Sequence, residues 1–169
     1  MSVRFRPPAP FFVYTAFLMI NAIKQFFEKN IQTSSDPADR ISEHSLQLAT
    51  AALMIEMMRA DAEISKDEKN SITRTIKLKF GLSEDETETI LRLAEDEISR
   101  STGYFEFTSL INKGYTYEQK LKVVEHLWEI AYSDSSLDKY EEHMVRKIAD
   151  LIHVSHKDFI DAKLRVRNI

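Results

Sequence analysis

An internal repeat constrains the fold of this chain more than any other feature of its sequence. The segment EMMRADAEISKDE, residues 56–68, aligns without a gap on EIAYSDSSLDKYE, residues 129–141. Each copy consists of an apolar stretch, then an acidic loop, then a charged segment. The matched positions are Glu56 with Glu129, Asp61 with Asp134, Ile64 with Leu137, and Glu68 with Glu141. Duplication of this kind predicts a pseudo-symmetric pair of helix–acidic loop–helix units.

Helix signals flank both acidic loops and continue along the chain. Apolar residues recur at helical spacing, and no sustained strand-like alternation occurs. The pair Asp36–Pro37 predicts the start of a first long helix that ends near Asp61. Further capping motifs predict helix starts at Ser65, Ser83, Thr116, Asp138 and Ser155, and glycines predict helix ends at Gly81 and Gly114. The sequence therefore predicts an all-α fold of about seven helices.

The first part of the chain differs in character from the rest. Residues 9–20 are apolar but too short to span a bilayer, which takes about 20 residues. They lead into an amphipathic stretch without a small-residue cleavage site, which argues against a secretory signal. The stretch VRFRPPAP can be encoded by DNA that carries a transfer-RNA T-loop and ends in CCA. We therefore expect a start at Met19, which divides the chain into a mis-called extension (1–18), an amphipathic segment with a linker (19–35) and a helical domain (36–169).

Charge and composition narrow the functional classes. Residues 34–156 hold 15 Lys or Arg against 24 Asp or Glu. An acidic body disfavours nucleic acid as a partner, because phosphate binding needs clustered basic charge. The absence of Cys excludes disulfides, thiolate metal sites and a Cys nucleophile, and it favours a cytoplasmic location. The sequence also lacks a Gly-rich phosphate loop and a nucleophile elbow, so we expect neither an enzyme nor catalytic residues.

The histidines do not form a metal-binding motif. An expected helix boundary separates His153 from His156, and no Cys accompanies them, which disfavours zinc. His126 and His143 each follow a glutamate on a predicted helix, where we expect exposed side chains with helical neighbours. His44 lies in the first long helix and has no evident partner.

The acidic loops offer only oxygen ligands, which suit Ca²⁺ or Mg²⁺ rather than Zn²⁺. The predicted metal ligands are Asp61, Glu63 and Glu68 in the first loop, and Asp134, Asp138 and Glu141 in the second. An EF-hand is excluded, because Lys66 stands at the required Gly and Ile72 at the closing Glu. The same carboxylates also suit plain helix caps, since the helix dipole favours acidic side chains in a first turn. The sequence leaves both interpretations open.

Three stretches resemble the TerB-like family of tellurite-resistance proteins. They are AALMIEMMRADAEISKDE, the connector FGLSEDE, and WEIAYSDSSLDKYEEHMVRKIADLIHVS ahead of DFIDAKLR, all within residues 41–167. The resemblance implies a compact helical domain of a bacterial cytoplasmic protein, with two acidic motifs implicated in metal binding. Some relatives belong to tellurite-resistance and stress-response operons, together with membrane-embedded TerC-type partners. Others are free-standing proteins of unknown function, and this chain is more similar to those.

The loops depart from the family pattern, which commonly reads Asp-Gly-Glu. Ala62 and Ser135 replace the Gly, and Ser136 replaces the second acid. Because Gly permits backbone conformations that Ala and Ser resist, we expect weaker cation binding than in the family at large. The leading hypothesis is a binding module that takes a cation in its acidic loops and presents a surface to a protein partner. The alternatives are a helical scaffold whose acidic loops are only caps and, least favoured, a metal-assisted hydrolase that uses the same carboxylates.

Overall fold

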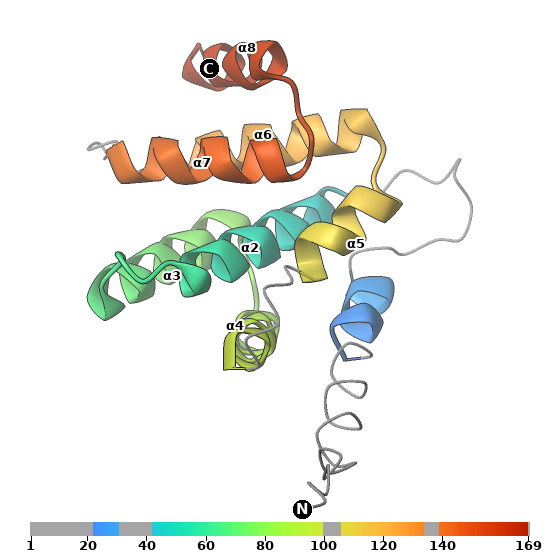
Figure 1. Cartoon of the computed structure of the whole chain (residues 1–169), viewed down its shortest axis with the longest axis vertical. Coiled ribbons are helices and arrows are strands. Elements are labelled where there is room, and N and C mark those ends of the chain that lie inside the picture. Colours follow the sequence, from blue (N-terminus) through green and yellow to red (C-terminus); the bar gives the residue numbers. More distant parts are fainter. Residues whose placement is uncertain (1–21, 31–41, 100–105, 134–138, 169) are drawn as a thin grey trace, which may run out of the picture.

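Helices make up all the regular structure of the part that the computed structural model describes, residues 22–30, 42–99, 106–133 and 139–168 (Figure 1). This confirms the predicted all-α class. The labelled helices are α2 (Glu43–Ala60), α3 (Lys66–Phe80), α4 (Glu84–Ser99), α5 (Glu106–Gly114), α6 (Tyr117–Ala131), α7 (Lys139–Leu151) and α8 (His156–Arg167). These correspond to the seven predicted helices. One more described helix covers residues 22–30, within the stretch predicted to be amphipathic.

α2 runs through the centre of the molecule because apolar side chains occur on almost all of its faces. Leu53, Ile55 and Met58 are fully buried, and nearly every residue between Ser45 and Met58 is buried with them. Helices α3, α4, α5, α6 and α7 all pack against α2. The helix is therefore the shared core element of the domain.

The two ends of α2 test the predicted boundaries of the first long helix. The helix begins at Glu43, where the Ser42 hydroxyl accepts a hydrogen bond from the Ser45 N–H at 3.1 Å. The predicted start at Asp36–Pro37 is therefore wrong, because Ser42 supplies the cap closer to the apolar run; Asp36 and Pro37 themselves lie outside the described residues. The helix ends before Asp61, as predicted.

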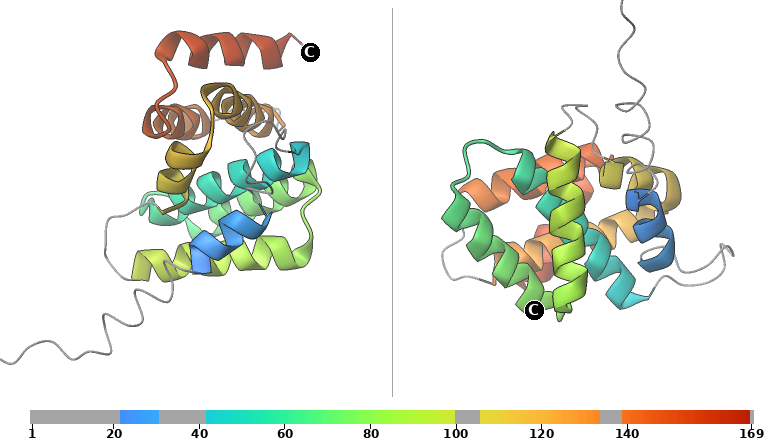
Figure 2. Two further views of the ribbon diagram at one scale, coloured as in Figure 1. Left: turned by 90° about the vertical axis from the view of Figure 1, so that its right-hand side faces the viewer. Right: turned by 90° about the horizontal axis from the view of Figure 1, so that it is seen from below.

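Two groups of helices cover α2 from opposite sides (Figure 2). α4 and the 22–30 helix lie on one side, and α6 with α7 lies on the other. α8 is outermost and packs mainly against α6. The apolar core runs through both groups, and its largest side chains, each less than 2% exposed, include Phe27, Phe107, Trp128 and Phe159. No helix in the described ranges is both long and apolar enough to cross a membrane.

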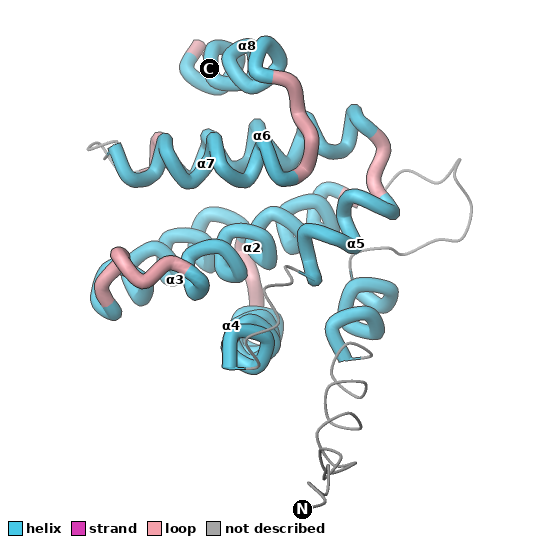
Figure 3. The backbone as a smooth tube through the Cα atoms, viewed as in Figure 1, coloured by secondary structure: helices cyan, strands magenta, loops and turns pink. Residues whose placement is uncertain are grey.

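Short loops join α2 to α3, α3 to α4, α5 to α6 and α7 to α8, and local motifs fix several of the helix starts (Figure 3). The capping boxes predicted at Ser65, Ser83 and Thr116 are all present. In each box the hydroxyl accepts an N–H three residues later, and the Glu or Gln at that position accepts the N–H of the capping residue. These starts were readable because every partner lies within one turn of the helix.

α3 and α7 end with the same backbone geometry. Gly81 has a φ of 62°, and the next N–H, that of Leu82, donates to the Lys77 carbonyl at 3.0 Å. His153 also has a φ of 62°, and the Val154 N–H donates to the Ala149 carbonyl at 2.9 Å. The repeat therefore extends to these two helix ends. The pseudo-symmetric pairing of whole units stays a prediction, because the second acidic loop, residues 134–138, lies outside the described residues.

Candidate functional site

The first acidic loop connects α2 to α3 and is held in shape from both sides. The N–H of Asp61 donates to the Met58 carbonyl at 3.3 Å, and its carboxylate accepts the N–H of Glu63 at 2.9 Å. Ile64 is buried in the core and ties the turn to the body of the domain. Asp61 and Glu63 thus occupy a short turn whose backbone is fixed by its own hydrogen bonds.

Glu68 closes the loop from the first turn of α3. One of its carboxylate oxygens accepts hydrogen bonds from the Ser65 hydroxyl at 2.7 Å and from the Ser65 N–H at 2.8 Å. These bonds, the hydroxyl first, lower the pKa of Glu68 below its ordinary value. The side chain is therefore ionised at neutral pH, and its structural role is that of a helix cap.

The carboxylates of this loop form no salt bridge. Within the described residues, no basic side chain pairs with Asp61, Glu63 or Glu68, and the adjacent Arg59 pairs instead with Glu95 at 2.7 Å. However, no three acidic or histidine side chains of the described chain converge on a point that could hold a metal ion. The first predicted ligand set is thus gathered in one loop but is not assembled around a common centre.

The second predicted ligand set falls mostly beyond the described residues. Asp134 and Asp138 lie outside them, and only Glu141 is placed, half-buried in the first turn of α7. The second site therefore stays a prediction.

Glu56, which begins the first copy of the repeat, has a role that the sequence analysis missed. Its carboxylate is buried, with the residue only 2% exposed. It accepts the Phe107 N–H at 2.8 Å, the Thr108 N–H at 3.2 Å and the Thr108 hydroxyl at 2.8 Å. Glu56 thus caps the N-terminus of α5 from the middle of α2. A lone carboxylate within the apolar run ALMIEMM was the available signal, since such a group must find donors when buried.

One of the histidine predictions is wrong. His126 is buried rather than exposed, and its Nε2 lies 2.7 Å from a carboxylate oxygen of Glu43, because the start of α2 lies over α6. His44, for which the sequence shows no evident partner, has its Nε2 2.8 Å from a carboxylate oxygen of Glu86, because α4 packs beside α2. Both partners come from helices that are remote in sequence.

The other two histidine predictions are confirmed. His143 is exposed on α7. A helix boundary separates His153 from His156, because α7 ends at Leu151 and α8 begins at His156.

A hydroxyl from α6 completes the N-cap of α8. Tyr117 donates its hydroxyl proton to Asp158 at 2.6 Å and accepts the N–H of Ser155 at 3.1 Å. The Ser155 hydroxyl also donates to Asp158 at 2.6 Å. These bonds, first from Ser155 and then from Tyr117, lower the pKa of Asp158. In the capping boxes at Ser65, Ser83 and Thr116, the Glu or Gln three residues later accepts the N–H of the capping residue directly. At the start of α8, the Tyr117 hydroxyl instead links the Ser155 N–H to the Asp158 carboxylate.

Aromatic and charged side chains attach the rest of α8 to α6 and α7. Phe159 packs on Trp128 with ring centroids 5.1 Å apart. The Lys163 ammonium lies 4.7 Å from the Trp128 ring centroid and pairs with Glu142 at 3.0 Å. The Lys163–Glu142 pair thus lies beside the aromatic contact between α8 and α6.

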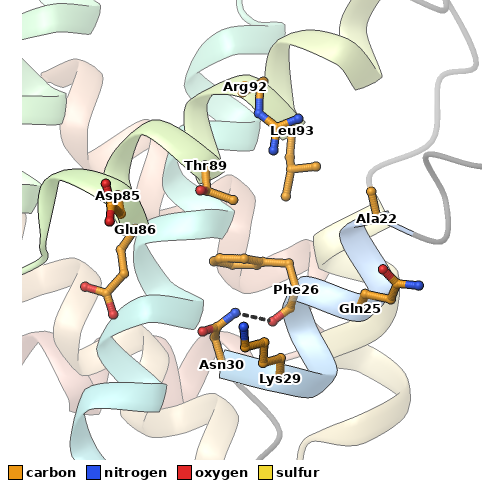
Figure 4. A pocket seen from close by; sticks show the side chains of 10 residues that line it. All are labelled: Ala22, Gln25, Phe26, Lys29, Asn30, Asp85, Glu86, Thr89, Arg92 and Leu93. Atoms are coloured by element: carbon orange, nitrogen blue, oxygen red, sulfur yellow. Dashed lines mark hydrogen bonds between the residues drawn. The ribbon is translucent and has the colours of Figure 1, made fainter.

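An open groove of about 440 Å³ lies between the 22–30 helix and α4 (Figure 4). The Phe26 ring lies between the two helices, with Thr89 and Leu93 of α4 across from it. Lys29 and Arg92 also line the groove, and Asp85 and Glu86 line its other end. The groove therefore combines an aromatic surface with charges of both signs.

Comparison with known protein families tests the resemblance to the TerB-like family that the sequence motifs indicate. A model of the family described as tellurite resistance protein TerB matches residues 47–164. The chain belongs to the TerB family. The match covers α3 to α7 completely, together with most of α2 and α8, and it includes both acidic loops. No curated protein and no solved structure matches the chain.

Proposed function

We propose that this TerB-family chain is a non-catalytic binding module. Its described polar side chains chiefly cap helices and join them to one another, as Glu56, Glu68 and Tyr117 do. A rigid, capped framework of this kind suits recognition, because the binding surface needs little ordering when a ligand arrives.

We propose a divalent cation as the ligand of the first loop, and its binding has to draw together three carboxylates that do not converge on a common point in this structure. The observation that supports the proposal is that Asp61, Glu63 and Glu68 form no salt bridge with a described basic residue. Oxygen-only ligands favour Ca²⁺ or Mg²⁺, which also retain water molecules as ligands. Asp61 and Glu68 already accept hydrogen bonds, so a cation has to compete with these bonds and binds weakly.

The family resemblance supports a proposal for the biological setting. A cation-loaded TerB-type domain would present an altered surface to a protein partner, and a membrane-associated TerC-type protein is the partner class that the resemblance implies. We place the chain on this basis in tellurite resistance or a related stress response.

Calorimetric titration of Ca²⁺, Mg²⁺ and Mn²⁺ into the full chain tests the cation proposal. We expect saturable heat that the double variant Asp61→Ala/Asp134→Ala abolishes. A matched control, Glu88→Ala/Glu118→Ala, removes two exposed acids outside the loops and leaves the titration unchanged. Equal loss of heat in both variants would indicate general charge screening and contradict a defined site.

The second candidate is a scaffold in which the acidic loops serve only as caps. The hydrogen bonds of Asp61 and Glu68 favour it, because both residues already have a structural role. This candidate predicts no saturable heat with any of the three cations and a lower unfolding midpoint for the Asp61→Ala/Asp134→Ala variant.

A further inference from the structure

The 22–30 helix lies outside the region that the family model matches, yet it completes the core. Ile23 and Phe27 are buried, and Phe27 is only 1% exposed. The Phe26 ring meets Phe107 edge-to-face with centroids 6.2 Å apart, and Phe27 packs on Tyr115 at 6.0 Å. The face formed by Ile23, Phe26 and Phe27 thus packs against α5 and against Tyr115, the residue after it.

Few polar contacts hold this helix in place. In the described chain its one hydrogen bond to the rest of the domain runs from the Ser45 hydroxyl to the Asn30 carbonyl, at 3.3 Å. Its ion pair, Lys24 with Glu28, stays within the helix. Its attachment therefore depends on the buried apolar face.

The fit of the helix is incomplete in two places. The Tyr115 hydroxyl is buried and has no hydrogen-bond partner among the described residues, and burial raises the pKa of this phenol. A buried hydroxyl without a partner is unfavourable, because it has lost its bonds to water. On the other side of the helix, the groove of about 440 Å³ separates it from α4 (Figure 4). Both features favour replacement by a better-fitting helix.

The surface beneath the helix is fixed independently of it. Glu56 holds the N–H groups of Phe107 and Thr108, so the first turn of α5 is anchored to α2. Because this anchoring does not involve the 22–30 helix, it favours a surface that is preorganised for another occupant.

We propose that Phe107 and Tyr115 form a docking surface for an amphipathic helix of a partner protein, and that the 22–30 helix is its displaceable intramolecular occupant. The partner helix carries an aliphatic residue followed three and four positions later by aromatic residues, as Ile23, Phe26 and Phe27 do here. Such spacing places the three side chains on one face of a helix. A polar group that reaches the Tyr115 hydroxyl would give the partner an advantage over the resident helix. The proposal is independent of the cation site.

The test uses a fluorescent synthetic peptide of residues 19–33 and the full chain. The variant Ile23→Ser/Phe27→Ser releases the resident helix, and the control Lys24→Ala/Glu28→Ala changes two exposed residues of the same helix that do not line the groove. We expect the released variant to bind the peptide at least about tenfold more tightly than the wild-type and control chains, because a tethered competitor acts at roughly millimolar effective concentration. A peptide with both phenylalanines changed to alanine binds at least about tenfold more weakly.

Circular dichroism and sedimentation accompany the titration. A folded, monomeric released variant that does not bind the peptide overturns the proposal. Dimerisation of the released or wild-type chain through this surface also overturns it, since the occupant is then a second copy.

A second measurement does not depend on the released variant. Because the chain has no Cys, a fluorophore at Lys24→Cys reports on the resident helix alone. We expect excess peptide to lower the fluorescence anisotropy as the helix is displaced, and an unchanged anisotropy at saturating peptide contradicts displacement.

Discussion

Among single residues, the buried Glu56 carboxylate links the repeat, the central helix α2 and the start of α5. It lies in the first copy of the repeat, within the most buried helix, and it caps α5 beneath the docking surface. A carboxylate in an apolar interior is tolerated only when hydrogen bonds compensate for its lost hydration. The hydrogen bonds that Glu56 accepts from two N–H groups and one hydroxyl provide that compensation.

Replacing Glu56 with Ala should be strongly destabilising. The N–H groups of Phe107 and Thr108 would lose their acceptor while remaining buried, which costs about 2–4 kcal/mol of unfolding free energy. Glu129→Ala is the matched control, because Glu129 holds the aligned position in the second copy and is only half-buried. We expect a change within about 0.5 kcal/mol for it in urea unfolding. Similar losses for both variants would contradict the capping role.

Backbone strain at His153 gives a second residue-scale prediction. His153 adopts the left-handed conformation that Gly81 adopts at the corresponding end of α3. We expect His153→Gly to stabilise the fold by roughly 0.5–1 kcal/mol, because glycine has no side chain to oppose this conformation.

The reverse change, Gly81→Ala, is the companion experiment. An added Cβ at Gly81 would meet no atom within 4 Å, so its cost, about 1 kcal/mol, is that of the backbone alone. Thermal unfolding of both variants measures the two effects, and a destabilised His153→Gly protein would show that the histidine side chain has a role of its own.

At the level of elements, α8 depends on side chains that other helices supply. Tyr117 completes its cap, and Glu125 and Glu142 pair with its basic residues Arg165 and Lys163. The cap at Ser155 and Asp158 was predictable, because both residues lie in one turn. The contribution of Tyr117 was not, because it depends on how α8 crosses the start of α6.

Tyr117→Phe should loosen α8 selectively. The change removes one hydroxyl that links the Ser155 N–H to the Asp158 carboxylate, and we expect a loss of about 1 kcal/mol. Amide hydrogen exchange should accelerate in residues 156–167 more than in α2. Tyr132→Phe is the control, because its ring stacks on Trp128 and its hydroxyl makes no hydrogen bond within the described chain. Uniform acceleration in all helices would contradict a local role.

For the whole molecule, the sequence predicted what local chemistry determines. The helix starts at Ser65, Ser83 and Thr116 follow from capping motifs within one turn, and the fold class and the family follow from helical periodicity and from longer sequence motifs. The pairing of His126 with Glu43 across α6 and α2 could not be predicted, because it requires knowledge of how the helices pack.

The candidate site was predicted less well than the fold. Asp61 and Glu63 lie in the turn after α2 and Glu68 lies in the first turn of α3, but their role as metal ligands stays a prediction. Grouping acidic residues by sequence could not tell a carboxylate that binds a neighbouring N–H from one that is free to bind a cation.

Ion pairs between helices give the whole molecule a defined response to acid. Burial alone would raise the pKa of Glu86, but hydrogen bonds from His44 and from the Ser83 N–H lower it below its ordinary value. Burial likewise opposes ionisation of Glu125, and bonds from Lys122 and Arg165 outweigh it, so its pKa is also lowered. Unfolding removes these partners, so both carboxyls return to the ordinary glutamate pKa of about 4.3 in the unfolded chain. The stability that they contribute is therefore lost as the pH falls below that value and through their lower pKa values in the folded protein.

Urea unfolding between pH 3 and pH 6, a range of about three units around the ordinary glutamate pKa, tests this response. We expect Glu86→Gln/Glu125→Gln to be less stable than wild type at pH 6 and to lose less of its stability on acidification. Glu88→Gln, at an exposed position, should follow the wild-type curve. Parallel curves for all three proteins would contradict the assignment of acid sensitivity to these two carboxylates.

The central position of α2 also has a consequence for synthesis of the protein. α2 ends at Ala60, but the helices that cover it extend to Leu151. At ~5–20 residues per second, a ribosome takes on the order of ten seconds to make the intervening chain. During that time the apolar faces of α2 have left the ribosome without their final neighbours. We therefore expect the nascent chain, more than the finished protein, to need protection by chaperones.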